Sequence, residues 1–424
     1  MREMKDSGVK WVGEIPSSWK VYKVKQIADS NNDVLPENYE EEQEIDYIEI
    51  GSVTYEHGVR TTEKMKFGNA PSRARRIVHN GDTIISTVRT YLKAIAYIND
   101  SLADKIVSTG FSVVTPHKDV VAKFLYYALS THSFISNVEA HSVGISYPAI
   151  NNTNLMDLKI VLPMQREQIQ IASYLDAKCS KIDEIIEKQQ AIIEKLKEYK
   201  LSIITEAVTS GINPDVEMKD SGSVWFGNIP INWEMKRLKY VFHIQKDIAG
   251  EEGHTVLSIT QRGIIPKDFS NNEGQFANSY ANYQLVHKGD FAMNHMDLLT
   301  GWVDISKYEG VTSPDYRVFV LNDKNGMCPE YYLYMMQMCY SARIFYGLGQ
   351  GVSGMGRWRL QADKFLNFYI PIPPYDEQKK IADYITDKVN HIEVEIDKRN
   401  KLIKKYQEYK KSLIYEVVTG KKEV

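Results

Sequence analysis

The sequence predicts an α+β protein in which two mixed α/β domains and two long coiled-coil helices form an internal duplication. Three observations lead to this class. A short segment at 4–19 recurs at 218–233. Residues 163–210 align without gaps with 373–420, and both segments carry apolar residues at alternating spacings of three and four. The longer stretches between these segments have diverged and mix strand-like and helix-like patterns.

The repeated opening segment is rich in Trp, Gly and Pro. Its first copy reads MKDSGVKWVGEIPSSW, and its second copy reads MKDSGSVWFGNIPINW. The two copies begin a repeat unit of roughly 210 residues, whereas solenoid repeats have periods of about 20–50 residues. We therefore interpret the repeat as the duplication of a whole domain together with its helix.

The diverged stretches, 17–162 and 231–372, are predicted to be mixed α/β. Runs of β-branched and aromatic residues between turn residues indicate strands, and two of these runs follow a Gly-Asp turn. The Tyr- and Met-rich run at 331–340 is typical of a buried core. We expect strands at 46–53, 82–88, 255–260 and 290–294, and short helices at 121–129 and 330–338.

The matched stretches are predicted to be long helices, because each begins at a Pro, ends near a Gly and keeps an apolar seam over about five heptads. About 45 residues make a rod of roughly 65–70 Å. Such a narrow seam needs a partner helix, which we expect to be the other copy. The seam itself leaves parallel and antiparallel pairing open, and two core helices of a bundle are the alternative. The apolar seam positions are Ala172, Leu175, Cys179, Ile182, Ile186, Ile193, Leu196, Ile203 and Ala207, then Ala382, Ile385, Val389, Ile392, Ile396, Ile403, Tyr406, Leu413 and Val417.

Composition limits the class of protein further. The formal net charge of −3 argues against a chain that coats nucleic acid alone, but it allows a local basic face. The three cysteines, Cys179, Cys328 and Cys339, form no C-x-x-C pair, so neither a disulfide framework nor a zinc site is indicated. The chain shows no apolar signal segment and no apolar run long enough to span a membrane. We expect a cytoplasmic protein without a membrane partner.

Three short motifs suggest enzyme chemistry, but each is incomplete. Residues 349–354 match the G-x-G-x-x-G pattern of dinucleotide sites, yet a predicted helix rather than a strand precedes them. Residues 372–375 (IPPY) resemble the Asn/Asp-Pro-Pro-Tyr motif of amino-methyltransferases without its Asn or Asp. Residues 214–219 resemble a metal-nuclease signature whose two halves are too close together. We assign no catalytic residue and no metal ligand, and we expect no enzymatic activity from this chain.

A basic strip runs through residues 60–93 of a chain that is acidic overall. Basic side chains can contact DNA phosphates and base edges, although a solvated charged face is the alternative. In the second copy, Arg-Trp-Arg at 357–359 follows the glycine motif, and its Trp is either a stacking residue or a buried one. The strip contains Arg60, Lys64, Lys66, Arg73, Arg75, Arg76, Arg89 and Lys93.

The ordered double set of motifs resembles the specificity (S) subunits of type I restriction–modification systems. Residues 11–19 (WVGEIPSSW) and 225–233 (WFGNIPINW) resemble the start of that family's target-recognition domains. The helix starts at 162–168 and 372–378, with their Pro and Glu-Gln, are similar to the family's spacer regions. The resemblance follows the family's order and covers essentially the whole chain.

The resemblance implies two target-recognition domains, each of which reads one half of a split, asymmetric DNA sequence. The two spacer helices would pack antiparallel, separate the domains and set the gap between half-sites. Approximate two-fold symmetry would make the chain two fused half-subunits. The implied segments are a first recognition domain at 1–162, a central spacer at 163–211, a second recognition domain at 212–372 and a distal spacer at 373–424.

The resemblance also implies partners and cofactors. The family's S subunit catalyses nothing; it binds double-stranded DNA and docks two modification subunits, which carry S-adenosylmethionine and methylate adenine. Two restriction subunits that use ATP and Mg²⁺ can join them. No cofactor is expected on this chain itself. The alternative is a coiled-coil scaffold whose domains bind proteins, which the long seams support equally well.

The family supplies no motif for base-contacting residues, so we take candidates from equivalent loop positions. After the Gly-Asp strands, the candidates are Thr87, Arg89, Tyr91 and Lys93 in the first copy and His295 and Asp297 in the second. Near the aligned glycines, they are Ser146, Tyr147, Arg357, Trp358 and Arg359. Arg73, Arg75 and Arg76 are expected to contact phosphates.

We predict that Arg89→Ala weakens DNA binding at one half-site only, because each domain reads one half of the sequence. Binding of the assembled complex to duplexes altered in one half at a time would measure this. Equal losses at both half-sites would reject the assignment of Arg89.

Overall fold

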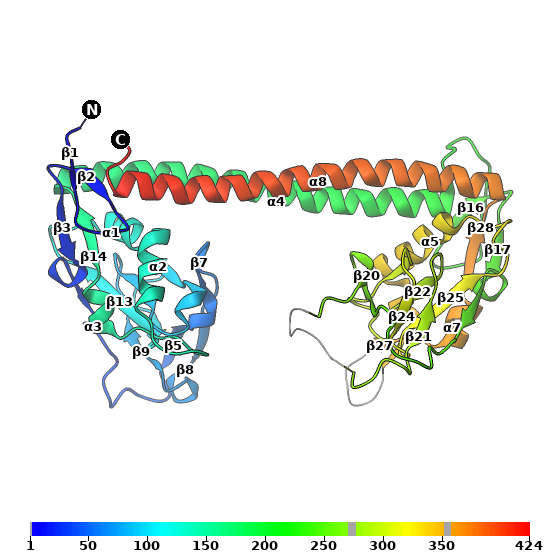
Figure 1. Ribbon diagram of the computed structural model, residues 1–424, viewed down its shortest axis with the longest axis horizontal. Coiled ribbons are helices and arrows are strands. Elements are labelled where there is room, and N and C mark those ends of the chain that lie inside the picture. Colours follow the sequence, from blue (N-terminus) through cyan, green and yellow to red (C-terminus); the bar gives the residue numbers. More distant parts are fainter. Residues whose placement is uncertain (1, 270–276, 352–357) are drawn as a thin grey trace. The chain divides into compact units, whose positions relative to one another are not determined.

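The computed structural model describes residues 2–269, 277–351 and 358–424 and divides into two compact units (Figure 1). The first unit contains Met1–Gln189 and Asn400–Val424, and the second contains Gln190–Arg399. Each unit therefore combines one globular half of the chain with one end of each long helix. The first unit is made of two separate segments of the sequence, and the second unit is one segment that begins and ends within the long helices.

The two long helices predicted from the seam are present. Helix α4 covers Gln165–Ser210 and helix α8 covers Tyr375–Val418. Each ends at a glycine in the left-handed region, Gly211 at φ +80° and Gly420 at φ +73°, as is common at helix C-termini. Most of the predicted seam positions are buried, so the period of three and four identified the contact face correctly.

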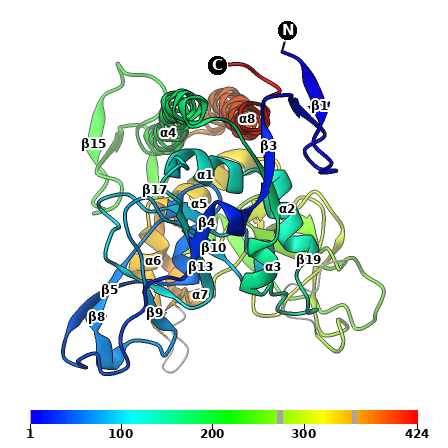
Figure 2. The ribbon, with the colours of Figure 1, turned by 90° about the vertical axis from the view of Figure 1, so that its left-hand side faces the viewer.

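The helices run antiparallel within each unit, and this confirms the predicted fold class. In the first unit, Lys410 of α8 forms an ion pair with Asp183 of α4 at 2.7 Å, and Arg2 contacts both Glu167 near the start of α4 and Glu423 beyond the end of α8. Figure 2 views this unit end on and shows its parts of α4 and α8 side by side.

The second unit pairs the same helices in the same sense. Lys200 of α4 forms an ion pair with Glu393 of α8. The buried hydroxyl of Tyr331 lies 3.3 Å from the carbonyl oxygen of Val208, near the end of α4, and 3.0 Å from that of Pro371, just before α8. The end of one helix therefore lies beside the start of the other.

The globular part of the first unit contains two four-stranded sheets. The first has the order β11-β10-β13-β4 and is antiparallel; the second has the order β8-β5-β12-β9, in which only β5 and β12 are parallel. Short ribbons β1-β2, β3-β14 and β6-β7 complete it. The strands are β1 (Met4–Asp6), β2 (Glu14–Pro16), β3 (Lys20–Lys23), β4 (Ala28–Ser30), β5 (Glu44–Ile48), β6 (Val53–Thr54), β7 (Gly58–Val59), β8 (Glu63–Lys66), β9 (Ala74–Ile77), β10 (Thr83–Ser86), β11 (Ile95–Tyr97), β12 (Ile106–Ser108), β13 (Phe111–Pro116) and β14 (Lys159–Leu162), and the helices are α1 (Ala122–Leu129), α2 (His132–Ala140) and α3 (Asn152–Met156).

The second unit repeats the first four-stranded sheet and two of the ribbons although its sequence has diverged; the ribbons β19-β20 and β21-β24 stand in place of a second four-stranded sheet. Its four-stranded sheet has the order β18-β25-β22-β23, and β17-β28 and β15-β16 correspond to β3-β14 and β1-β2. The Tyr- and Met-rich run lies in α5 and is part of the core, as predicted. The strands are β15 (Met218–Asp220), β16 (Asn228–Pro230), β17 (Glu234–Arg237), β18 (Phe242–Gln245), β19 (Leu257–Thr260), β20 (Gly263–Pro266), β21 (Gln284–Val286), β22 (Phe291–Met293), β23 (Val303–Ile305), β24 (Gly310–Thr312), β25 (Arg317–Leu321), β26 (Gln350–Gly351), β27 (Trp358–Arg359) and β28 (Tyr369–Ile372), and the helices are α5 (Pro329–Ser341), α6 (Ile344–Leu348) and α7 (Ala362–Asn367).

The repeated opening segment closes the end of a long helix in each unit. In the first unit, fully buried Trp19 donates its indole N–H to Glu167 at 3.0 Å. The backbone of Gly420, just after α8, lies against Pro16 and Trp19. In the second unit, Gly211 after α4 lies in the same way against Pro230 and Trp233. The opening segment occurs twice in the sequence because each copy packs against the C-terminal end of one long helix.

The Glu-Gln pair at the start of each long helix fastens that helix to its globular half. Gln168 accepts a hydrogen bond from the backbone N–H of Val121 at 2.8 Å and donates one to the carbonyl of Pro163 at 3.0 Å. Gln378 makes the equivalent bonds to Cys328 and Pro373. Both glutamine side chains are buried, so each needs these partners. The sequence motif is thus a structural joint.

Within 2–269, 277–351 and 358–424, no helix is both long enough and apolar enough to cross a membrane.

We predict that Gly420→Ala destabilises the chain more than Gly8→Ala. Both glycines have a positive φ, +73° and +65°, so both substitutions incur the left-handed penalty of about 1–2 kcal/mol. Only the Cβ at position 420 would collide with Pro16, whereas the surroundings of Gly8 are open. Thermal unfolding of the two variants measures the difference, and equal melting temperatures would contradict the proposed closure of the helix end.

Candidate nucleic-acid interface

The loop after β10 has an unusual backbone at two of the predicted DNA contacts. Arg89 and Lys93 both adopt the left-handed conformation, with φ of +50° and +55°, on either side of a single 3₁₀ turn at Thr90–Leu92. This conformation is unfavourable for residues with a Cβ, and such strain occurs preferentially at functional sites. The turn leaves Arg89 and Tyr91 exposed.

A second loop, at 143–149, is attached directly to the first. Its base is closed by two backbone hydrogen bonds between Val143 and Ala149, at 2.9 and 3.0 Å. The N–H of Ile150 donates to the carbonyl of Thr87 at 2.9 Å, and the hydroxyl of Thr90 donates to that of Ser142 at 2.8 Å. The two loops therefore form one surface.

The structure brings two predicted contacts together on this surface. The guanidinium of Arg89 lies over the ring of Tyr147 at 5.0 Å from its centre, an arrangement in which the ring face attracts the cation. Ser146 is exposed beside Tyr147. Lys93 is less available, because its ammonium forms an ion pair with Glu139 at 3.4 Å.

The arginines expected to contact phosphates lie next to the same surface but differ in exposure. Arg73 is exposed, and its carbonyl accepts a hydrogen bond from Thr109 at 2.8 Å; the adjacent Gly110 carbonyl accepts one from Thr87 at 2.8 Å. Arg75 lies over the ring of Phe67 at 4.7 Å. Partial burial lowers the pKa of Arg76 from its ordinary value. Arg73 is thus the most accessible cation of the three.

In the second unit, the loop after β22 places His295 in a buried position. Its carbonyl accepts a hydrogen bond from the N–H of Leu360 at 3.0 Å, so this loop and the segment around Arg359 meet just as the two loops of the first unit do. Burial, together with the positive charges of Arg317 and Arg359, lowers the pKa of His295 to about 3. His295 is therefore neutral at physiological pH, whereas Arg359 is exposed and charged.

The other predicted contacts of the second unit have structural partners. Asp297 accepts hydrogen bonds from the backbone N–H groups of Leu299 and Thr300 at 3.0 and 2.9 Å, which shapes the loop. Trp358 donates its indole N–H to the carbonyl of Tyr346 at 2.6 Å and stacks on that residue's ring at 5.2 Å. Arg357 lies outside the described residues. The assignment of all these residues to DNA contact stays a prediction.

The glycine motif before Trp358 has a packing explanation. A Cβ added at Gly349 would come within 2.5 Å of the Trp358 ring, and one at Gly351 within 3.0 Å. The described part of the motif, up to Gly351, therefore lets an indole lie against the backbone.

A buried cation beneath His295 escaped the sequence analysis. Arg317, in β25, is only 5 % exposed, and its guanidinium donates a hydrogen bond to the carbonyl of Leu360 at 2.9 Å. Its guanidinium lies over the ring of Phe365 at 4.9 Å, and burial lowers its pKa to about 10. One signal was available, since an arginine begins the otherwise apolar strand RVFVL.

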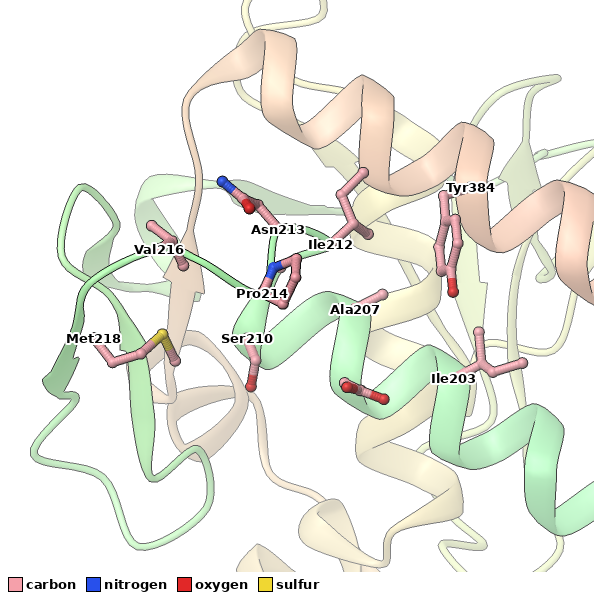
Figure 3. Close-up of a pocket in the computed structure, with 11 residues that line it drawn as sticks. Ile203, Ala207, Ser210, Ile212, Asn213, Pro214, Val216, Met218 and Tyr384 are labelled. Atoms are coloured by element: carbon pink, nitrogen blue, oxygen red, sulfur yellow. The ribbon is translucent and has the colours of Figure 1, made fainter.

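A hollow of about 390 Å³ lies in the second unit where α4 ends (Figure 3). Its wall combines Ile203 and Ala207 of α4, Ile212 and Pro214 of the following linker, and Tyr384 of α8. Across the described part of the chain, no three His, Cys, Asp or Glu side chains are grouped so as to hold a metal ion.

Comparison with known families gives a match over both halves of the chain. The family model described as "Type I restriction modification DNA specificity domain" matches residues 16–200 and 230–405. The two matched ranges each begin at the end of an opening segment and extend into a long helix. They therefore follow the duplication described above.

Individual relatives are distant. The type I restriction enzyme MjaIX specificity subunit of Methanocaldococcus jannaschii is 26% identical over 247 residues, which are 55% of this chain and 54% of that subunit. The chain thus spans about half the length of this relative. The putative type I restriction enzyme MjaX specificity subunit of the same organism is 23% identical over 435 aligned positions, which cover 97% of this chain and 95% of that protein.

A solved structure has the same fold. It comes from work on the "Structural basis underlying complex assembly and conformational transition of the type I R-M system". The TM-score is 0.70 at 17% sequence identity, and the match covers 96% of this chain and 99% of the other.

We predict that His295 makes folding less favourable in acid. The folded pKa of about 3 lies below the ordinary value of 6.5, so the unfolded chain takes up the proton first as the pH falls below about 6.5. By pH 5 this linkage should cost roughly 2 kcal/mol. His295→Gln should remove that part of the pH dependence of urea unfolding, whereas a His243→Gln control at an exposed site should not.

Nuclear magnetic resonance of the His295 ring provides an independent check. Its signal should keep the position of neutral imidazole down to pH 5. A titration midpoint near 6.5 would contradict the buried, neutral state.

Proposed function

Because the chain belongs to the type I restriction–modification DNA specificity family, we propose that it selects the DNA sequence on which a type I complex acts. Each unit reads one half of a split double-stranded site, and the chain itself contributes no catalytic residue. The observation that carries this proposal is the duplication of one fold with different side chains at the equivalent loops.

The difference between the two loop surfaces supports recognition of an asymmetric site. The first unit offers Arg89 stacked on Tyr147, together with exposed Arg73. The second unit offers exposed Arg359, while His295 at the loop position equivalent to that of Arg89 is buried and neutral. Arginine pairs best with guanine edges or phosphates, and the two units place their exposed arginines among different neighbours. Surfaces that differ in this way would prefer different base sequences.

The parts of the two units outside these loops make equivalent contacts, and this similarity supports the docking of two identical partners. The opening segments, the Glu-Gln joints and the long helices have equivalent contacts in both units. We propose that these parts dock two modification subunits, which bind S-adenosylmethionine and methylate adenine, and that two restriction subunits with ATP and Mg²⁺ join them. The hollow beside Ile212 and Tyr384 is a suitable place for an apolar side chain of a modification subunit.

The antiparallel helices support the proposed role as a spacer. A seam of buried aliphatic side chains with ion pairs at its edge makes a stiff element. We propose that the length of these helices sets the number of base pairs between the half-sites. The proposed boundaries of the recognition and spacer segments remain those at 162, 211 and 372.

Methylome sequencing tests the function directly. The chain is expressed with its modification subunit in a host that lacks adenine methylation. We predict a single new split adenine motif, because two differing surfaces separated by a fixed spacer define two half-sites and one gap. A stable complex that methylates without sequence preference, or not at all, would favour a protein scaffold instead.

A further inference from the structure

The tip of the loop at 143–149 carries an apolar side chain that nothing in the folded chain covers. The exposed fraction is 80% for Val143, 103% for Ile145 and 66% for Tyr147. Tyr91, on the neighbouring loop, is 51% exposed. Large apolar side chains gathered in this way on a surface mark a place of contact with another molecule.

The tip is held in place by its own backbone. Two hydrogen bonds between Val143 and Ala149 close its base. Gly144 has φ +119°, and a Cβ there would come within 3.1 Å of the Tyr147 carbonyl oxygen, so the tight turn requires glycine. Arg89 holds Tyr147 from one side through its cation–π contact. The loop therefore presents Ile145 at little further cost in conformational freedom.

The charges around the tip favour nucleic acid over protein as its partner. Among the described residues, neither Arg89 nor Arg73 has a carboxylate within ion-pair distance, and the only acidic side chain paired to this loop pair, Glu139, is neutralised by Lys93. The loop at 143–149 thus combines a narrow apolar tip with two neighbouring cations, Arg89 and Arg73. This combination is complementary to a polyanion that has an apolar interior. In DNA, that interior is the stack of base pairs.

We infer that Ile145 is a wedge that enters the bound duplex and separates two neighbouring base pairs at the half-site read by the first unit. The inference rests on the proposed function and deepens it by naming how one half-site is read. Isoleucine is among the side chains that proteins insert between base steps. Arg89 and Arg73 would hold the adjoining phosphates while the step opens.

The wedge makes recognition depend on how easily one step deforms. Pyrimidine–purine steps unstack more readily than others, so the half-site should require such a step where Ile145 enters. An opened step would also ease extrusion of a neighbouring base for methylation. The base sequence at that step would thus be selected by how easily the DNA deforms rather than by a hydrogen bond to a base.

The test uses the complex of the full chain with its modification subunits and duplexes that contain 2-aminopurine at successive positions. We expect the fluorescence to rise at one step of the first half-site, because 2-aminopurine is quenched by stacking. Ile145→Ala should abolish this rise and slow methylation of that half-site at least tenfold, and Ile145→Leu should retain both. Ile248→Ala, at a site in the second unit that is 52% exposed, is the matched control and should change neither.

A second duplex distinguishes insertion of Ile145 between base pairs from a contact of Ile145 with the DNA surface. A mismatch placed at the same step opens it in advance, and it should restore methylation by Ile145→Ala. An unchanged fluorescence rise in Ile145→Ala, or a defect confined to assembly with the modification subunit, would overturn the wedge. Failure of the proposed function itself would look different, since the wild-type complex would then show no sequence-specific methylation.

Discussion

The interaction on which the structure depends is the closure of each long-helix end by a Trp/Pro opening segment. Gly420 lies against Pro16 and Trp19, and Gly211 lies against Pro230 and Trp233. In the first unit this contact joins the two ends of the chain, because Tyr415 and Lys421 also bond to the carbonyl of Val12. Large buried aromatic side chains supply much of the apolar area in such a joint. The opening segment is thus repeated in the sequence because the chain has two equivalent helix ends.

This closure explains why some parts of the two halves have stayed alike while others have diverged. A glycine with positive φ, a buried Trp and a buried Gln with two hydrogen bonds allow few substitutions. The loops after β10 and β22 contain no buried Trp or Gln of this kind, and main-chain hydrogen bonds join each of them to its neighbouring segment. Side chains such as Arg89 and His295 can therefore change while the sheets that carry them persist. A protein built in this way can vary what it reads without altering how it is assembled.

The sequence predicted the elements whose pattern is periodic and missed the features that depend on tertiary packing. The seam from Ala172 to Ala207 identified α4, because one face of a long helix repeats many times. The strand predicted at 46–53 instead ends at Ile48, and a 3₁₀ turn follows at Ile50–Ser52; a short apolar run does not encode where a strand bends. The equivalent loop positions gave Arg89 and Tyr147 as separate candidates, and only the structure shows that the two side chains lie together. Nothing local indicated that His295 would be buried beside Arg317, since that depends on the pairing of β22 with β25, a strand more than 20 residues further along the chain.

The central claim is that each unit independently reads half of a split site, and an internal exchange of domains tests it most directly. Residues 17–162 are replaced by a second copy of 231–372, so that both helix ends and both joints are retained. Methylome sequencing of the complex should then show a symmetric motif that repeats the second half-site on both sides of the gap. An unchanged motif, or one in which both halves are new, would contradict independent reading by the two units.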